Sequence, residues 1–131
     1  MKAAVIKEYG KIALDEVSKP EAADDHVLVR VRYASICGSD QHIFKGEFHP
    51  RTKLPLIPGH EFAGVVEETG KLVKEFKPGN KVTVDPIIWC GKCAACLAGH
   101  YPACTTLKLV GIDLDGGFAE FVSVPESKIY R

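Results

Sequence analysis

Four cysteines in the last third of the sequence have the spacing of a metal site. They are separated by two, two and seven residues and are Cys90, Cys93, Cys96 and Cys104. Four thiolates satisfy a tetrahedral zinc ion, and spacers of two residues allow the first three sulfur atoms to converge on one point. Because a closed shell of four sulfur atoms leaves no position for water, we predict a structural zinc site in a lobe at about residues 89–107.

Iron and disulfide bonds are the alternatives for this cluster. The bacterial ferredoxin run also begins Cys-x2-Cys-x2-Cys, but its next spacer has three residues and its last cysteine precedes a proline. Here Thr105 follows Cys104. Four sulfur ligands alone do not exclude iron, although the spacing favours zinc. A disulfide scaffold favours an even number of cysteines and a secretory signal, whereas this sequence has five cysteines and no signal-like apolar segment at its start.

A second, looser set combines a thiol, an imidazole and a carboxylate, which belong to Cys37, His60 and Glu61. Three such ligands leave one position on a zinc ion open for water or substrate, and zinc with an open position polarises an alcohol or carbonyl oxygen. Gly59 is expected to allow the backbone bend that turns both His60 and Glu61 toward one metal. Spacing alone does not exclude the ordinary alternative, in which Cys37 is a small buried residue and Glu61 is solvated.

Short strands with glycine and proline between them must position both sets. Residues 27–33 alternate, so that Val27, Val29, Val31 and Tyr33 are expected on one face. Further strands are expected at residues 3–6 and 12–17, which form a hairpin, and at 60–67, 81–84 and 118–124. The pattern predicts a mainly β barrel or sandwich with only short helices.

Two short helices are expected beside the candidate ligands. Ser39 is expected to cap a helix that continues through residues 41–44, with Asp40 in its first turn. A second helical turn is expected at residues 94–98 and ends at Gly99. In the cysteine lobe, Trp89 is expected to be a packing residue. His100 is expected to be a solvated loop residue.

Composition narrows the function classes. A chain of 131 residues fits one domain. Seventeen basic residues balance seventeen acidic ones, so nothing favours nucleic acid or a membrane surface as a partner. Without a targeting segment the expected location is the cytoplasm. No strand continues into Gly-x-Gly-x-x-Gly and a helix, so no dinucleotide-binding half is expected within these residues.

Several motifs in the same order resemble the zinc-dependent medium-chain alcohol dehydrogenase family, and within it the sorbitol, threonine and butanediol dehydrogenase branch. Besides the cysteine lobe, the matching runs are Cys37-Gly38-Ser39-Asp40-x-His42, Pro58-Gly59-His60-Glu61-x-x-Gly64, Pro78-Gly79-x-x-Val82 and Gly116-Gly117-Phe118-Ala119-Glu120. The resemblance implies that residues 1–131 form the catalytic domain of such an enzyme. The expected fold is a GroES-like, partly open β-barrel with a few short helices and a four-cysteine zinc lobe.

The resemblance implies two zinc ions per chain. One is structural, and Cys37, His60 and Glu61 would hold the catalytic one. The second cysteine ligand of the alcohol branch would lie beyond Arg131, whereas the polyol branch relies on the glutamate with water or a later carboxylate. A polyol or amino alcohol is therefore the favoured substrate.

The resemblance also implies a route for the proton of the alcohol. Ser39 resembles the hydroxyl that takes this proton, and His42 resembles the histidine that passes it to solvent. Asp40 resembles the carboxylate that orients the ligand His60. Phe44 and Phe48 are candidates for an apolar substrate wall or for plain core packing.

The resemblance also indicates which cofactor and which partners to expect. NAD(P) would be bound by a separate nucleotide-binding domain or chain, so these residues alone are expected to be inactive. A homo-oligomer is compatible with the sequence. Two alternatives remain, a non-catalytic zinc-binding domain used for assembly or regulation and an iron-bearing electron-transfer module.

Overall fold

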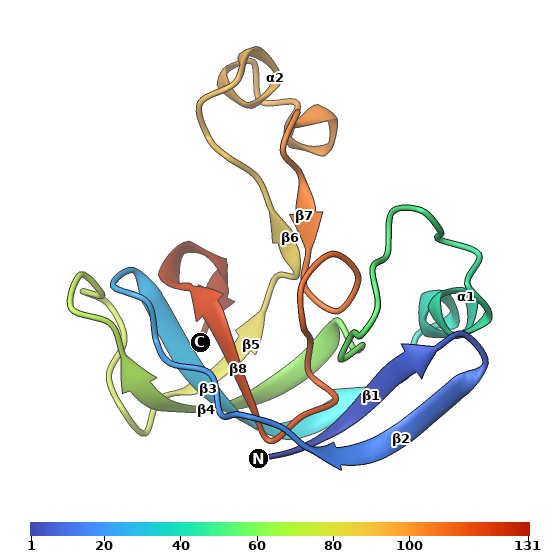
Figure 1. The fold of residues 1–131 in the computed structure, drawn as a ribbon. Helices are drawn as coiled ribbons and strands as arrows, with labels where there is room; N and C mark the ends of the chain where they lie inside the picture. Colours follow the sequence, from blue (N-terminus) through green and yellow to red (C-terminus); the bar gives the residue numbers. More distant parts are fainter.

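The computed structural model describes all residues 1–131, and the chain is mainly β (Figure 1). A five-stranded antiparallel sheet has the order β8-β3-β4-β5-β9 and curves into a half-barrel. Its strands are β3 (His26–Ser35), β4 (Glu61–Thr69), β5 (Lys81–Val84), β8 (Phe121–Pro125) and β9 (Ile129–Tyr130). Two antiparallel pairs complete the β structure, β1 (Lys2–Glu8) with β2 (Lys11–Glu16) and β6 (Ile87–Ile88) with β7 (Lys108–Leu109).

The main core lies on one face of the five-stranded sheet. Its buried residues are mostly valines, which suit a pleated surface, and they are Val27, Val29, Phe62, Val66, Val82, Val84, Val110, Val122, Val124 and Ile129. A smaller cluster of Ile6, Ile43, Leu56 and Ile112 joins the β1–β2 hairpin to helix α1 (Gly38–Lys45). The strands and the hairpin predicted from alternation are thus confirmed, with ends shifted by up to three residues.

The predicted alternation along β3 fails at its end. Tyr33 is 80% exposed and does not share the buried face of Val27 and Val29. The pairing explains the difference, because Val31 is opposite Gly64 and Tyr33 is opposite the adjacent Ala63. One extra residue in β3 reverses the side-chain direction that follows it.

Helix α1 begins differently from the prediction. Cys37 occupies the N-cap position, not Ser39. The Asp40 carboxylate accepts a hydrogen bond from the Cys37 backbone N–H over 2.8 Å, as the third helical residue does in a capping box. Asp40 therefore fixes the start of the helix, and the Ser39 hydroxyl is free to face elsewhere.

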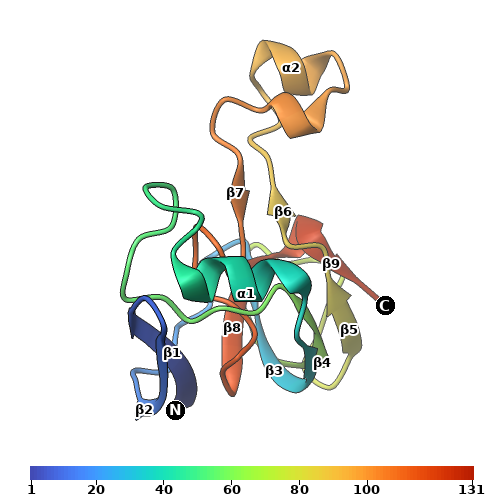
Figure 2. The same cartoon turned by 90° about the vertical axis from the view of Figure 1, so that its right-hand side faces the viewer.

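The cysteine lobe projects from the half-barrel on the β6–β7 pair, as both views show (Figures 1 and 2). It contains α2 (Ala94–Leu97) and a 3-10 turn (Tyr101–Ala103), and Gly99 follows α2 in the left-handed conformation with φ of +79°. At its base the ring of Trp89 stacks on Tyr101 with centroids 4.5 Å apart, which agrees with the packing role predicted for Trp89. No helix of the structure has the length and apolar character needed to cross a membrane.

Candidate metal centres

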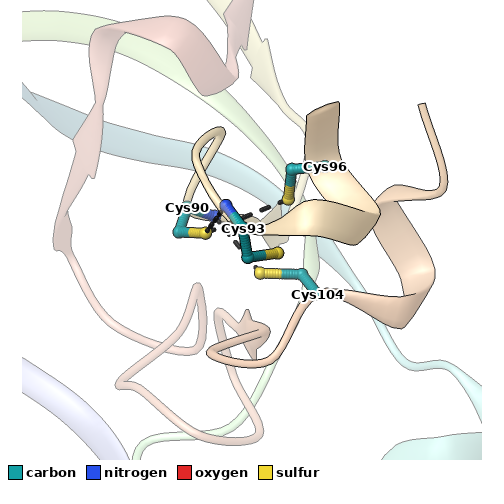
Figure 3. A group of neighbouring side chains, drawn as sticks. All are labelled: Cys90, Cys93, Cys96 and Cys104. Carbon is teal, nitrogen blue, oxygen red and sulfur yellow. Dashed lines mark hydrogen bonds between the residues drawn. The ribbon is translucent and has the colours of Figure 1, made fainter. Parts of the chain in front are cut away.

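The four cysteines of the lobe converge on one point (Figure 3). Cys90 follows β6, Cys93 is the N-cap of α2, Cys96 lies within α2, and Cys104 follows the 3-10 turn. Their sulfur atoms all lie within 4.8 Å of one another, and all five cysteines of the chain are free thiols. The predicted four-cysteine cluster is therefore formed, and it fits a tetrahedral metal rather than a pair of disulfides.

Backbone N–H groups surround these sulfur atoms and favour thiolates. The N–H of Cys93 donates to the sulfur of Cys90, and the N–H of Cys90 donates to that of Cys104, each over 3.4 Å. Hydrogen bonds from the backbone at Cys96 and Thr105 lower the pKa of Cys93 to about 6, and the Cys90 N–H lowers the pKa of Cys104. Burial raises the pKa of Cys96 to about 12. Placing four sulfur atoms together with one so buried is costly unless a cation compensates their charge.

The second set of predicted ligands is also brought together, by strand pairing. Ser35, the last residue of β3, lies opposite Glu61, the first residue of β4. Cys37 comes two residues after Ser35 and His60 one residue before Glu61, so Cys37 meets the adjacent His60 and Glu61, which are distant from it in sequence, at one end of the sheet. Their ligand atoms lie within 4.8 Å of one another. Cys37 and His60 are half-buried and Glu61 is exposed, which leaves a solvent-facing side to the group.

Asp40 faces the imidazole of His60. Its Oδ1 lies 3.5 Å from His60 Nδ1, and neither of these buried atoms has a hydrogen-bond partner. The Asp40 side chain is nearly fully buried, so its charge is costly unless it acts on a neighbouring group. With Nδ1 turned toward Asp40, Nε2 is the nitrogen left for a metal. Ser39 Oγ lies 3.2 Å from this Nε2, so the structure places Ser39 beside the three ligands.

Glu61 is held as a carboxylate by two neighbours. The Ser35 hydroxyl donates to Glu61 Oε2, and hydrogen bonds from Ser35 and then Cys37 lower the pKa of Glu61. An ionised carboxylate is the form that binds a metal. Sequence reasoning missed Ser35, and the register of β3 on β4 is the signal that would have found it.

Glycines hold the backbone that carries His60 and Glu61. Gly59 has φ of +95°, and a Cβ there would lie 2.5 Å from the ring of Phe118. The carbonyl of Gly59 accepts from the Gly117 N–H over 2.7 Å, and that of Pro58 accepts from the Phe118 N–H over 3.0 Å. The Gly116-Gly117-Phe118 motif thus fixes the segment before the ligand pair, and the bend expected at Gly59 is present.

His42 lies apart from the ligand group. Its ring is largely exposed, and its Nδ1 is hydrogen-bonded to Glu47 rather than to Ser39. A Ser39-to-His42 proton route therefore stays a prediction. Phe44 and Phe48 pack against the cluster around Ile43, which supports core packing for both, and His100 is exposed as expected.

The comparisons with known proteins agree with this geometry. Residues 23–131 match the alcohol dehydrogenase GroES-like domain. The chain belongs to this family. L-threonine 3-dehydrogenase of Bacillus subtilis (strain 168) is 42% identical to it over 135 residues, which cover 100% of this chain and 39% of that protein.

Solved structures confirm the GroES-like fold of this domain. A thermostable alcohol dehydrogenase of Pyrobaculum aerophilum with bound cobalt and zinc superposes with a TM-score of 0.91 at 35% identity, over 98% of this chain and 40% of that one. A short chain alcohol dehydrogenase of E. coli CFT073 complexed with NADH gives a TM-score of 0.92 at 37% identity, over 100% of this chain and 38% of that one. The GroES-like chain spans about two fifths of the length of its curated relatives.

Proposed function

We propose that this chain is the catalytic domain of a zinc-dependent, NAD(P)-linked dehydrogenase that acts on an alcohol or polyol. The observation that carries the proposal is the group of Cys37, His60 and Glu61 at one end of the sheet. Its composition leaves a metal with an open position, and Asp40 stands behind the histidine. Family membership supports the same conclusion, since relatives have names such as threonine and alcohol dehydrogenase.

Each residue of the group has a role that follows from its position. A zinc ion bound there supplies a Lewis acid that lowers the pKa of an alcohol. Asp40 orients the His60 ring and keeps its Nε2 available. Ser35 holds the Glu61 carboxylate toward Cys37. The Ser39 hydroxyl, 3.2 Å from His60 Nε2, is placed to accept the alcohol proton, which we propose leaves through His42.

The half of the reaction that needs a nicotinamide belongs to residues outside this domain. The relative solved with NADH is more than twice as long as this chain, and these 131 residues contain no dinucleotide fingerprint. The proposal therefore assigns NAD(P) to a separate nucleotide-binding domain or chain. The adjacent Glu61 favours a polyol or amino alcohol over a simple alcohol.

Cobalt substitution tests the proposal directly. Cobalt reports ligand number and type by its visible spectrum, and we expect two cobalt ions per chain, one with four sulfur ligands and one with mixed ligands. Adding butane-2,3-diol or sorbitol should change only the mixed-ligand bands, because only that ion has an open position. Cys37→Ala should remove those bands.

Two outcomes would contradict the proposal. A single metal ion, bound by the four cysteines alone, would support a non-catalytic zinc domain used for assembly or regulation. A chain that purifies with iron and a strong visible chromophore would support an electron-transfer module. Ethanol serves as the control ligand, since the proposed preference for polyols predicts a smaller spectral change with it.

A further inference from the structure

The imidazole of His42 is held by the residues that end helix α1. Gly46 follows the helix in the left-handed conformation, with φ of +82°. The backbone N–H of Glu47 donates to the His42 carbonyl over 2.9 Å, and the Glu47 carboxylate is hydrogen-bonded to His42 Nδ1. Glu47 therefore contacts one residue through both its backbone and its side chain.

Packing fixes the turn that places Glu47. A Cβ on Gly46 would lie 2.8 Å from the ring of Tyr9, so both the backbone angle and the available space require glycine there. The Phe48 and His42 rings form a T-shaped pair, with centroids 6.4 Å apart and planes at 72°. The imidazole thus has an aromatic neighbour and a carboxylate that is held against Nδ1.

We propose that Glu47 sets the tautomer of His42, so that Nδ1 carries the proton and Nε2 is the free acceptor. An ionised carboxylate only accepts hydrogen bonds, so the nitrogen that it contacts must carry a proton. In a neutral imidazole the lone pair then lies on the other nitrogen. Glu47 is a positioning residue in this scheme, because it acts through His42 and touches no reacting atom.

Glu47 keeps its negative charge at the neutral pH at which the tautomer of His42 is relevant. The hydrogen bond with His42 lowers the pKa of Glu47, and the charges of His42 and Lys45 lower it further. The carboxylate is therefore ionised at neutral pH. Lys45 is the basic residue of the last helical turn beside this pair, and it carries no acceptor that would compete for the Nδ1 proton.

The consequence for proton transfer rests on the proposed function. A proton released by the alcohol would bind to His42 Nε2 and form an imidazolium ion whose Nδ1–H remains on Glu47. The same proton then leaves Nε2 for water, and the ring returns to its starting tautomer. Without Glu47 the proton of the neutral ring is free to occupy Nε2, which blocks that nitrogen as an acceptor.

Nitrogen-15 NMR of the histidine rings of the zinc-loaded chain tests the tautomer without any measurement of activity. Two-bond and three-bond correlations show which ring nitrogen carries the proton, and His42→Gln identifies the His42 signals. At a pH where the ring is neutral we expect Nδ1–H in the parent chain. Glu47→Ala should lower the ratio of Nδ1–H to Nε2–H by about fivefold, with a smaller change for Glu47→Gln, whose amide oxygen still accepts.

A matched control separates this effect from a general loss of negative charge. Glu21→Gln removes an exposed carboxylate outside α1 and should leave the ratio unchanged. The inference is overturned if the parent ring carries its proton on Nε2, if Glu47→Ala has no effect, or if Glu21→Gln has the same effect. The NMR measurement of the His42 tautomer does not need a zinc ion at Cys37. If no metal binds at Cys37, the proposed function is refuted, but the effect of Glu47 on the His42 tautomer can still be measured and judged separately.

Discussion

The two candidate metal centres are assembled in opposite ways. The lobe takes four ligands from fifteen consecutive residues, and the lobe stands away from the barrel on one short pair of strands (Figure 2). The second group takes its ligands from two segments that the β3–β4 ladder joins. We infer that the metal organises the polypeptide in the lobe, whereas the barrel organises the polypeptide around Cys37. The predictions below test this contrast, from the largest expected effect to the smallest.

Cys96→Ala should give the largest effect, confined to the lobe. Cys96 is 5% exposed, and structural zinc is coupled to the folding of the chain around it. We expect loss of one zinc and at least about 100-fold faster amide exchange between residues 89 and 107. Hydrogen exchange with mass spectrometry measures this, and β3 and β4 should keep their protection. An unchanged lobe would refute its dependence on metal.

Gly59→Ala should destabilise the barrel and weaken the second centre together. Left-handed φ costs a residue with a side chain about 1–3 kcal/mol, and the Phe118 ring leaves the new Cβ no room. We expect a total loss of about 3–5 kcal/mol in the free energy of unfolding by urea.

Gly79→Ala is the matched control for this change. Gly79 has φ of +92° and nothing within 4 Å of its Cβ position. It should show only the cost of the backbone angle and should keep full zinc affinity at Cys37. Equal losses in both variants would mean that the contact with Phe118 has no role.

Cys37→Ala should empty the second centre with little effect on the fold. The hydrogen bond from the Cys37 backbone N–H to Asp40 at the start of α1 remains when the side chain is shortened to alanine, and the β3–β4 pairing does not involve the Cys37 side chain. We expect one zinc fewer by elemental analysis and a change of less than about 1 kcal/mol in the free energy of unfolding of the metal-free chain. Cooperative loss of the barrel would show that the metal organises this site as well.

Lys128→Met should have the smallest effect, and the size of this effect should depend on pH. Lys128 lies over Trp89 at the base of the lobe, with its Nζ 3.5 Å from Asp85. Burial lowers the pKa of Lys128 below 10.5. The folded chain therefore binds fewer protons than the unfolded chain between the lowered pKa and about 10.5.

The stability of the parent chain should consequently rise with pH through this window, and Lys128→Met should remove that rise. Urea unfolding at pH 7 and at successive steps up to pH 10 measures the difference between the two chains. A parallel rise in both would assign the pH dependence to other groups.

Features that depend on local spacing were predictable from the sequence. The cysteine cluster, the hairpin and the strand at residues 81–84 were all expected and are present. Predictions from the sequence failed where a contact with a neighbouring residue selects between two structures that the local sequence allows. Ser39 is a good capping residue by type, but the helix begins two residues earlier, with Cys37 as its N-cap, because Asp40 accepts the Cys37 N–H.

Features that depend on pairing across the sheet were not predictable. The extra residue in β3 that exposes Tyr33 is visible only against Gly64 and Ala63 of β4. The partnership of Ser35 with Glu61 requires the same register. The contact of Glu47 with His42 was local enough to be found, since helix termination at Gly46 folds the next residue back on the last turn.

The β6–β7 pair has a consequence for how the cysteine lobe can be replaced. Ile88 and Lys108 lie directly opposite one another, so the chain leaves the barrel and returns to it at neighbouring positions. Residues 89–107 are therefore topologically an insertion in a hairpin, and a short turn in their place would close the same two strands. The connectivity of the barrel does not require the lobe. Evolution or protein design can therefore replace residues 89–107 with another segment without changing the order of strands in the sheet.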